Sequence, residues 1–343
     1  YIVILLSEKK PAAFEAKQTI QEVMTATREK VKNITFNPED FEVINIDIEI
    51  KNLNPIFHNY KIINLCDIHL GQWMTPEYLN GVVDIVNSHK PDMVTLTGDY
   101  VSYNIDDVKD DLEDSLKKLK PKDVSLAVLG NHDHWLNPET IKKVLKNANI
   151  HNVSNDVFVL NKEGHELYVA GVDSMMVGED NLGKVLTKIP DESAAILLAH
   201  EPDFADLSSL SRKFSLQISG HSHGGQFIIP GINTTLFRGS YSRKYPVGKY
   251  KVGNMIQYTS RGLGTNIFWF RLNCPPEITI FHLKSPIVQE KLREKESLEE
   301  DENKGQTNEN ILALSLENIE SMYKNSETYE KFEKGLNKLL KRE

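Results

Sequence analysis

The sequence predicts an α/β fold in which two packed β-sheets are covered by helices. Strand-like and helix-like segments alternate in the first half of the chain, and a second series of short apolar segments follows in the second half. The interval from Asp67 to Asp99 and the interval from Asp99 to Asn131 are both 32 residues, close to the ~30 residues of one strand-helix-strand crossover. We therefore expect three neighbouring parallel strands whose carboxyl ends share one edge of a sheet.

The elements predicted in the first half lead, in order, to polar residues. Residues 8–33 are rich in Ala, Glu, Lys and Gln and predict a helix, and the apolar alternation over 41–50 predicts a strand. The next expected elements are a strand at 62–66 before Asp67, a helix at 76–88, a strand at 93–97 before Gly98 and Asp99, a helix at 106–119, and a strand at 126–129 before Asn131, His132 and Asp133.

The second half predicts five further strands, at 167–171, 195–199, 216–219, 255–260 and 277–283. His200 directly follows the second of these segments, and His221 and His223 follow the third. Polar residues again stand at the end of a strand, so we expect them to converge on the same site as Asp67 and Asp99.

The composition is that of a globular chain with no general affinity for polyanions. The 343 residues are 40% hydrophobic and carry a formal net charge of −9, whereas nucleic acids are normally bound by surfaces dense in Lys and Arg. We therefore expect no nucleic-acid partner. The two cysteines, Cys66 and Cys274, form neither a CxxC metal motif nor a disulfide framework, so a reducing, cytoplasmic location is expected.

Three regions are expected along the chain: an N-terminal helical segment at 1–40, a main domain at 41–285, and a C-terminal segment at 286–343. The apolar run Ile2 to Leu6 is either a short strand or the end of a membrane anchor, although five residues fall far short of the ~20 that span a bilayer. An anchor would hold the protein at the inner face of the membrane. The C-terminal segment begins as a charged linker and then predicts amphipathic helices that pack on the domain or on a second copy of the chain.

Two short motifs have the spacing of metal ligands. In extended backbone, residues i and i+2 point the same way, so Asp67 and His69 can share one cation, and so can His221 and His223. Either pair alone is a weak signal, because a single histidine near a strand end is more often structural. Together with Asp99, Asn131 and His200 they form a set of carboxylate, amide and imidazole donors without thiolates. This set suits Mn²⁺, Fe or Zn²⁺ with open positions for water and substrate.

Asp99 is expected to be the residue shared by two metal ions. It follows a glycine on the middle one of the three strands, and a carboxylate there can bridge two ions ~3.5–4 Å apart. Two ions so placed generate a bound hydroxide and hold an anionic phosphoryl group. The expected reaction is in-line attack of that hydroxide on phosphorus.

Five motifs in order resemble the calcineurin-like metallophosphoesterases: Asp67-Ile68-His69, Gly98-Asp99, Gly130-Asn131-His132-Asp133, the isolated His200, and Gly220-His221-Ser222-His223. The resemblance spans roughly residues 60 to 283, and an ordered set is far more specific than any single motif. It implies a four-layered sandwich of two mixed sheets flanked by helices.

The resemblance also implies a role for each residue. One metal would be bound by Asp67, His69, Asp99 and His223, and the other by Asp99, Asn131, His200 and His221. His132 would not bind metal but would stabilise the transition state and protonate the leaving oxygen, and Asp133 would orient it.

Further features resemble a membrane-associated prokaryotic branch of the family, whose members hydrolyse phosphodiesters or pyrophosphates, including UDP-2,3-diacylglucosamine-type lipids. These features are Gly224-Gly225-Gln226, Arg261-Gly262-Leu263-Gly264 and Pro275-Pro276-Glu277-Ile278. Arg261 is a candidate to bind a second phosphate group. The aromatic runs Phe268-Trp269-Phe270 and Trp73-Met74 either face a lipid or, as we favour, pack in the core and loops.

The expected function is therefore two-metal hydrolysis of phosphodiester or pyrophosphate bonds, with Mn²⁺ as the favoured metal and a small or lipid-linked substrate. The alternative is a non-catalytic scaffold that keeps the fold to bind a protein partner. Such a scaffold is expected to have lost metal ligands, and this chain retains every one of them.

Overall fold

The computed structural model describes residues 36–71, 73–228, 240–266 and 271–295. The predicted N-terminal helix, the run Ile2 to Leu6, residues 268–270 and most of the C-terminal segment lie outside these ranges, so the expectations about them stay predictions. Contacts divide the chain into two units, Tyr1–Pro286 and Ile287–Glu343. In the second unit residues 287–295 are helical.

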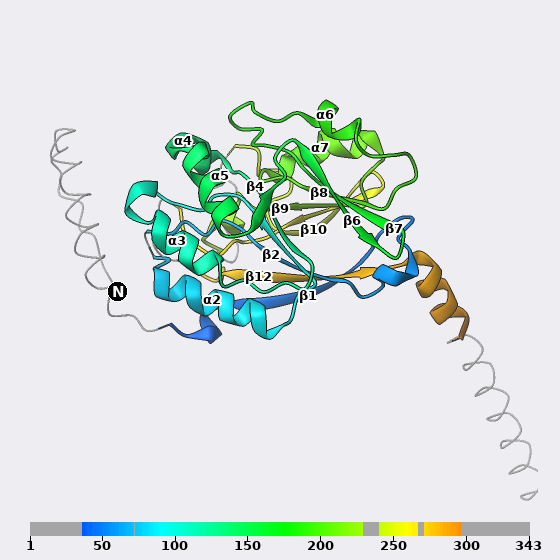
Figure 1. The fold of residues 1–343 in the computed structure, drawn as a ribbon, viewed down its shortest axis with the longest axis horizontal. Coiled ribbons are helices and arrows are strands. Elements are labelled where there is room, and N and C mark those ends of the chain that lie inside the picture. Colours follow the sequence, from blue (N-terminus) through cyan, green and yellow to red (C-terminus); the bar gives the residue numbers. More distant parts are fainter. Residues whose placement is uncertain (1–35, 72, 229–239, 267–270, 296–343) are drawn as a thin grey trace, which may run out of the picture. The chain divides into compact units, whose positions relative to one another are not determined.

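Two six-stranded mixed sheets form the centre of the first unit (Figure 1). The first sheet has the order β1-β12-β2-β3-β4-β5, with bounds Glu42–Glu49, Glu277–Lys284, Lys61–Leu65, Met93–Thr97, Val124–Val128 and Ile150–Asn152. The second has the order β10-β11-β9-β8-β7-β6, with bounds Gly248–Val252, Met255–Thr259, Leu216–Ser219, Ala195–Leu198, His165–Gly171 and Asp156–Lys162. β2, β3 and β4 are parallel neighbours, as expected.

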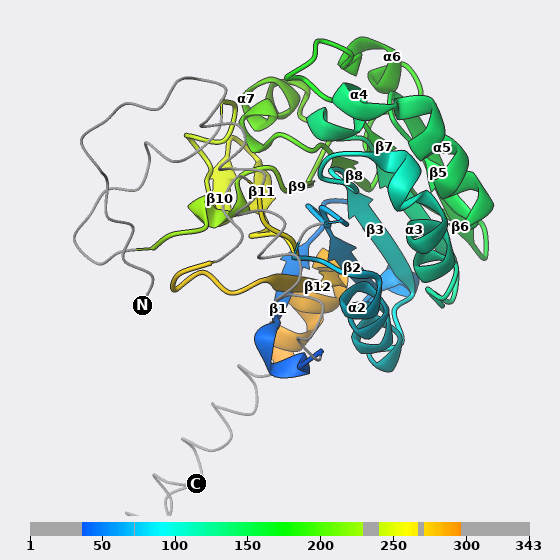
Figure 2. The same cartoon turned by 90° about the vertical axis from the view of Figure 1, so that its left-hand side faces the viewer.

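Helices cover the outer face of each sheet, which gives four layers. Next to the first sheet lie α2 (Pro76–Ser88), α3 (Lys109–Leu116), α4 (Asn131–Leu136) and α5 (Pro138–Asn147), and Figure 2 shows α2 and α3 beside β2 and β3. α6 (Leu182–Leu186) and α7 (Ala205–Ser208) accompany the second sheet. The predicted fold of two mixed sheets flanked by helices is confirmed.

The cores follow from the twofold alternation of side chains along the strands. Ile62 of β2 packs between the two sheets with Leu198 and Ile218, whereas the next residue, Ile63, packs against the helices with Val82. β3, β4, β8 and β9 are buried along their whole length, because both of their faces are covered. Their apolar sequences were therefore readable as strands.

Several boundaries differ from the prediction. The expected helix at 106–119 is a short 3₁₀ turn, Ile105–Asp107, followed by α3 at Lys109–Leu116. The strands β5, β6 and β10 were not predicted; β6 and β10 lie at the two sides of the second sheet, where β10 alternates between half-buried and exposed residues and β6 has a single buried residue, Leu160. Trp73 and Met74 pack with the core beneath α2, where Trp73 contacts Phe41 and Tyr78, as favoured above.

Candidate metal centre

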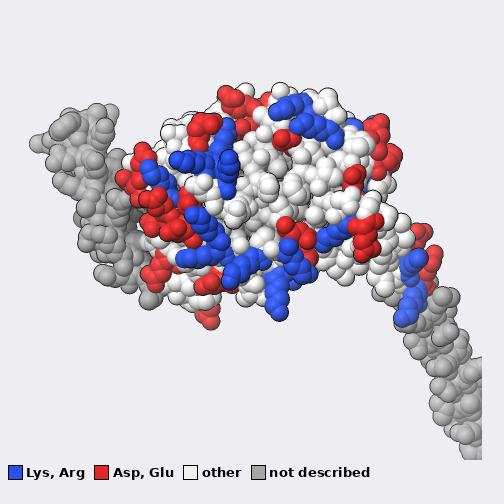
Figure 3. Space-filling model, viewed as in Figure 1, with Lys and Arg blue, Asp and Glu red and all other residues white. Residues whose placement is uncertain are grey.

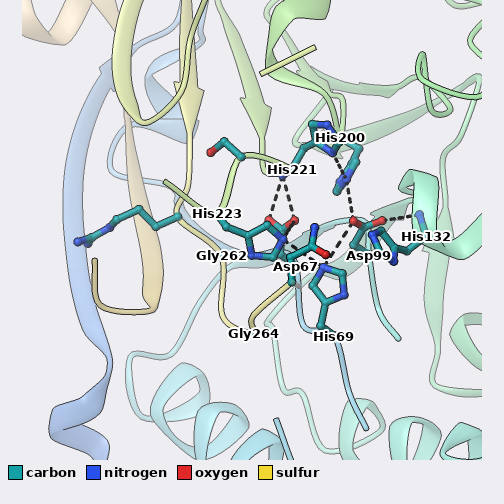
Figure 4. A network of polar contacts seen from close by, with 12 residues as sticks. Asp67, His69, Asp99, His132, His200, His221, His223, Gly262 and Gly264 are labelled. Atoms are coloured by element: carbon teal, nitrogen blue, oxygen red, sulfur yellow. Dashed lines mark hydrogen bonds and ion pairs between the residues drawn. The ribbon is translucent and has the colours of Figure 1, made fainter. Parts of the chain in front are cut away.

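The predicted site residues meet at the carboxyl ends of strands from both sheets (Figure 4). Asp67 follows β2, Asp99 follows β3, and Asn131 begins α4 shortly after β4, all in the first sheet. His200 follows β8, while His221 and His223 follow β9, both in the second sheet. The site therefore lies where the two sheets meet, and each sheet supplies part of it.

The backbone at the site is left-handed at five of these residues. Asp67, His69, Asp99, His221 and His223 all have φ between 48° and 69°, a region that residues other than glycine seldom adopt. Such conformations cost about 1–3 kcal/mol each and persist where the surrounding structure enforces them, typically at functional sites. The turns that follow β2, β3 and β9 are thus shaped to bring side chains inward.

One cluster consists of Asp67, His69 and His223. The two imidazole Nε2 atoms lie 3.2 Å apart, and Nε2 of His223 lies 3.4 Å from a carboxylate oxygen of Asp67. One potential ligand atom from each residue lies within 4.8 Å of the other two. The backbone N–H of His221 donates to both oxygens of Asp67, at 3.0 and 3.1 Å, which fixes the orientation of this carboxylate.

A second cluster consists of Asp99, His200 and His221. Nε2 of His200 lies 3.1 Å from Oδ2 of Asp99 and 3.2 Å from Nδ1 of His221. The same Asp99 oxygen lies 3.6 Å from Nε2 of His69, so Asp99 faces both clusters. The side-chain oxygen of Asn131 is buried and has no partner among the described residues.

Backbone carbonyls set the outward-facing nitrogen of two histidines. Nδ1 of His200 lies 2.7 Å from the carbonyl of Thr97, and Nε2 of His221 lies 2.8 Å from the carbonyl of Ser240. Because a carbonyl can only accept, each of these nitrogens carries a proton, and the second nitrogen of each ring, Nε2 of His200 and Nδ1 of His221, faces into the cluster. This arrangement is typical of metal-binding histidines.

The electrostatics of the site favour metal binding. Burial lowers the pKa of His69 to about 3, and burial together with neighbouring His69 and Arg271 holds the pKa of His223 well below its usual range. Both imidazoles are therefore neutral at physiological pH, the form that binds metals. Burial opposes ionisation of both Asp99 and His200, but their mutual attraction outweighs it, so the pKa of Asp99 is held well below its usual range and the pKa of His200 well above.

The donor set fits two divalent cations. Imidazole nitrogens face each other at 3.2 Å in both clusters, and a buried amide oxygen has no partner in the described part of the chain. No lysine or arginine side chain forms an ion pair with Asp67 or Asp99 among the described residues. A cation in each cluster would satisfy these atoms.

His132 lies beside the clusters on α4. Its backbone N–H donates to Oδ1 of Asp99 at 2.9 Å, and its half-buried ring packs edge-on against the ring of His69 at a centroid distance of 4.8 Å. The side chain is thus close enough to reach a group bound between the clusters.

The expected role of Asp133 is corrected by its contacts. Its carboxylate accepts hydrogen bonds from the backbone N–H groups of Asp99, Tyr100 and Gly130 at 2.8–2.9 Å, and the described contacts include none to the ring of His132. Burial and the charge of Asp99 raise the pKa of Asp133 to about 7. Asp133 therefore fixes the loop that carries Asp99, because three N–H donors satisfy it fully.

The structure also corrects the expectation for Arg261. Its Nε donates to Glu277 at 2.7 Å and its Nη2 donates to Glu42 at 2.6 Å. The guanidinium is thus held by two carboxylates and is not directed at a substrate phosphate. Its place is structural: it joins the start of β12 to β1.

A residue that sequence reasoning missed is Arg271. Its guanidinium donates to the backbone carbonyls of Arg261 at 2.8 Å, Gly262 at 3.2 Å and His223 at 3.4 Å. It thereby joins the loop over Asp67 to the turn of His223. No spacing or motif marks this arginine in the sequence, because its partners are main-chain atoms that only the folded chain brings together.

Gly262 is packed against Asp67, which gives a testable prediction. Its φ is +70°, and a Cβ there would lie 2.6 Å from Cβ of Asp67. We expect Gly262→Ala to lower the free energy of unfolding by about 2–4 kcal/mol and to weaken metal binding. Thermal unfolding and metal titration measure the two effects.

Gly164 provides the control for this substitution. It has a similar φ of +84° but nothing within 4 Å of the added Cβ, so Gly164→Ala isolates backbone strain, about 1–2 kcal/mol. Equal losses of stability in the two variants, with unchanged metal affinity in Gly262→Ala, would contradict the argument.

The fold and the donor set define a class: a metal-dependent phosphoesterase. The chain belongs to the calcineurin-like phosphoesterase family, whose model matches residues 60–225. The metallophosphoesterase YkuE of Bacillus subtilis is 33% identical over 67% of this chain and 80% of that protein. The family depends on divalent metals, and the two clusters of possible ligands, one around Asp67 and one around Asp99, agree with that.

Two further relatives carry informative names. Phosphodiesterase YaeI of Escherichia coli is 28% identical over 65% of this chain and 82% of that protein. A transmembrane protein with metallophosphoesterase domain from Danio rerio is 26% identical over 81% of this chain and 65% of that protein. Within the described ranges of the present chain, none of the helices combines the length and the apolar character needed to cross a bilayer.

Proposed function

We propose that this protein hydrolyses phosphodiester or pyrophosphate bonds with two divalent cations. The observation that carries the proposal is that Asp99 faces both ligand clusters through one carboxylate oxygen, 3.6 Å from His69 and 3.1 Å from His200. Asp67, His69, Asp99 and His223 would bind one cation, and Asp99, Asn131, His200 and His221 would bind the other. Two such cations supply Lewis acidity, which activates water and neutralises charge on the phosphoryl oxygens.

Residues of the chain itself would protonate the leaving oxygen and hold the metal ligands in position. His132 stands beside the shared carboxylate, held by its backbone N–H on Asp99, and its imidazole would stabilise the phosphoryl charge and give a proton to the leaving oxygen. Asp133 and Arg271 hold the loops of Asp99 and His223 through main-chain bonds. These residues keep the donors in place before any ligand arrives.

The substrate we favour is a small phosphodiester or a lipid-linked pyrophosphate, with Mn²⁺ as the metal. The name of YaeI supports a diester, and the name of the Danio rerio relative is compatible with a protein at the inner face of a membrane. On the face shown in Figure 3, Lys and Arg are interspersed with Asp and Glu. A surface of mixed charge binds the phosphates of a nucleic acid weakly. Self-association would involve the C-terminal segment, most of which lies outside the described residues.

The test is hydrolysis of bis-p-nitrophenyl phosphate by the purified full chain. We expect release of p-nitrophenol with Mn²⁺, loss of activity after dialysis against a chelator, and recovery when Mn²⁺ is returned. Activity that survives complete metal removal would contradict a metal mechanism. A chain that binds neither Mn²⁺, Fe nor Zn²⁺ would favour the non-catalytic scaffold.

A further inference from the structure

Trp135 is exposed at a place where an exposed indole is unexpected. Its side chain lies on α4, three residues after His132, and is 56% exposed. A single exposed apolar residue is common in proteins, but its neighbour here is the residue proposed to meet the leaving group. Its one ring contact among the described residues is with His132, so burial does not account for its position.

The rings of His69, His132 and Trp135 form a row that leads outward from the metal centre. The ring of His69 is fully buried, with its centroid 4.8 Å from that of His132. The centroid of His132 is in turn 4.9 Å from that of Trp135, with the two planes inclined at 53°. The one-turn spacing on α4 produces this contact, since residues i and i+3 lie on the same face of a helix. Trp135 is the solvent-facing end of the row.

The position of this row constrains the substrate. An imidazole that protonates the leaving oxygen must lie within hydrogen-bond reach of it, so the group attached to that oxygen would lie next to His132, whose exposed neighbour is Trp135. Trp135 offers this group a flat apolar face on which a planar ring can stack.

We propose that Trp135 is a specificity-determining residue that stacks on a planar aromatic or heteroaromatic ring in the leaving group of the substrate. The inference rests on the proposed function and adds the chemical class of the leaving group. Stacking of such a ring on an exposed indole is expected to raise the affinity for the ligand by about tenfold over a ligand without the ring.

The test compares two inhibitors that differ only in the ring. Phenylphosphonate and methylphosphonate are titrated calorimetrically into the Mn²⁺-loaded full chain. We expect Trp135→Ala to lower the affinity for phenylphosphonate by about tenfold and to leave the affinity for methylphosphonate unchanged. Trp135→Phe should keep most of the preference for phenylphosphonate over methylphosphonate. With bis-p-nitrophenyl phosphate, Trp135→Ala should raise KM and leave kcat nearly unchanged. Leu210→Ala is the matched control, because Leu210 is 77% exposed and precedes β9, at the opposite end of that strand from His221.

The outcomes separate the two proposals. If the loaded chain binds both phosphonates but Trp135→Ala changes both affinities equally, or neither, the role of Trp135 is overturned and the metal site stands. If the loaded chain binds neither phosphonate, the proposed function itself fails. If Trp135→Ala lowers the affinity for phenylphosphonate alone, and Leu210→Ala changes neither affinity, the stacking role of Trp135 is supported.

Discussion

Replacing Asp99 with alanine is expected to remove both metal ions and to reduce kcat/KM by more than about a thousandfold, because the metals supply most of the charge stabilisation in this class of reaction. Among the described residues, Asp99 is the carboxylate that faces both clusters, so its loss would leave each cation one anionic ligand short. Metal content by mass spectrometry and hydrolysis of bis-p-nitrophenyl phosphate measure the two effects.

The control for Asp99→Ala is Asp84→Ala, which removes an exposed carboxylate from α2 and should leave metal content and activity intact. Circular dichroism verifies that both variants are folded. If Asp99→Ala keeps two metals per chain, the bridging position assigned to Asp99 is wrong.

Replacing His132 with glutamine is expected to reduce kcat by about 10²–10⁴-fold, the usual contribution of a general acid, with both metals retained. The expected loss depends on the leaving group. A substrate that releases p-nitrophenol needs little protonation and should lose least, while an alkyl diester should lose most. Comparing the two substrates distinguishes proton transfer from a general loss of structure.

His134→Gln is the matched control, two residues further along α4. His134 is paired with Asp173 at 2.7 Å, and none of its described contacts reaches the ligand clusters. It should leave kcat nearly unchanged with either substrate. An equal loss of kcat for both substrates in His132→Gln would indicate that His132 stabilises the phosphoryl charge and does not protonate the leaving oxygen.

The sequence predicted most of what depends on local pattern. The helix at 76–88 and the strand at 93–97 match α2 and β3 in their bounds, since a buried strand and an amphipathic helix are legible in their apolar periods. The convergence of Asp67, Asp99 and Asn131 also followed, because the two 32-residue intervals imply neighbouring parallel strands that share one sheet edge.

What the sequence could not predict depends on tertiary contacts. Asp133 and Arg261 stand in motifs that suggested catalysis and substrate binding, yet the first caps three backbone N–H groups and the second joins Glu277 to Glu42. Within the described part of the chain, Arg271 bonds to main-chain carbonyls and one thiol, whose positions no local pattern encodes. The positive φ angles at five candidate ligands are likewise imposed by packing.

The strand order of the first sheet has a consequence for how the chain folds. β12, the last strand of the unit, lies between β1 and β2, and Glu42 of β1 pairs with Glu277 of β12. During synthesis, β1 and the facing edge of β2 therefore stay unpaired until β12, near the end of the unit, has left the ribosome. Pairings of such long sequence separation form slowly and expose aggregation-prone edges in the meantime. The insertion of β12 is thus expected to be the late, rate-limiting event of folding, and chains truncated before it are expected to depend on chaperones.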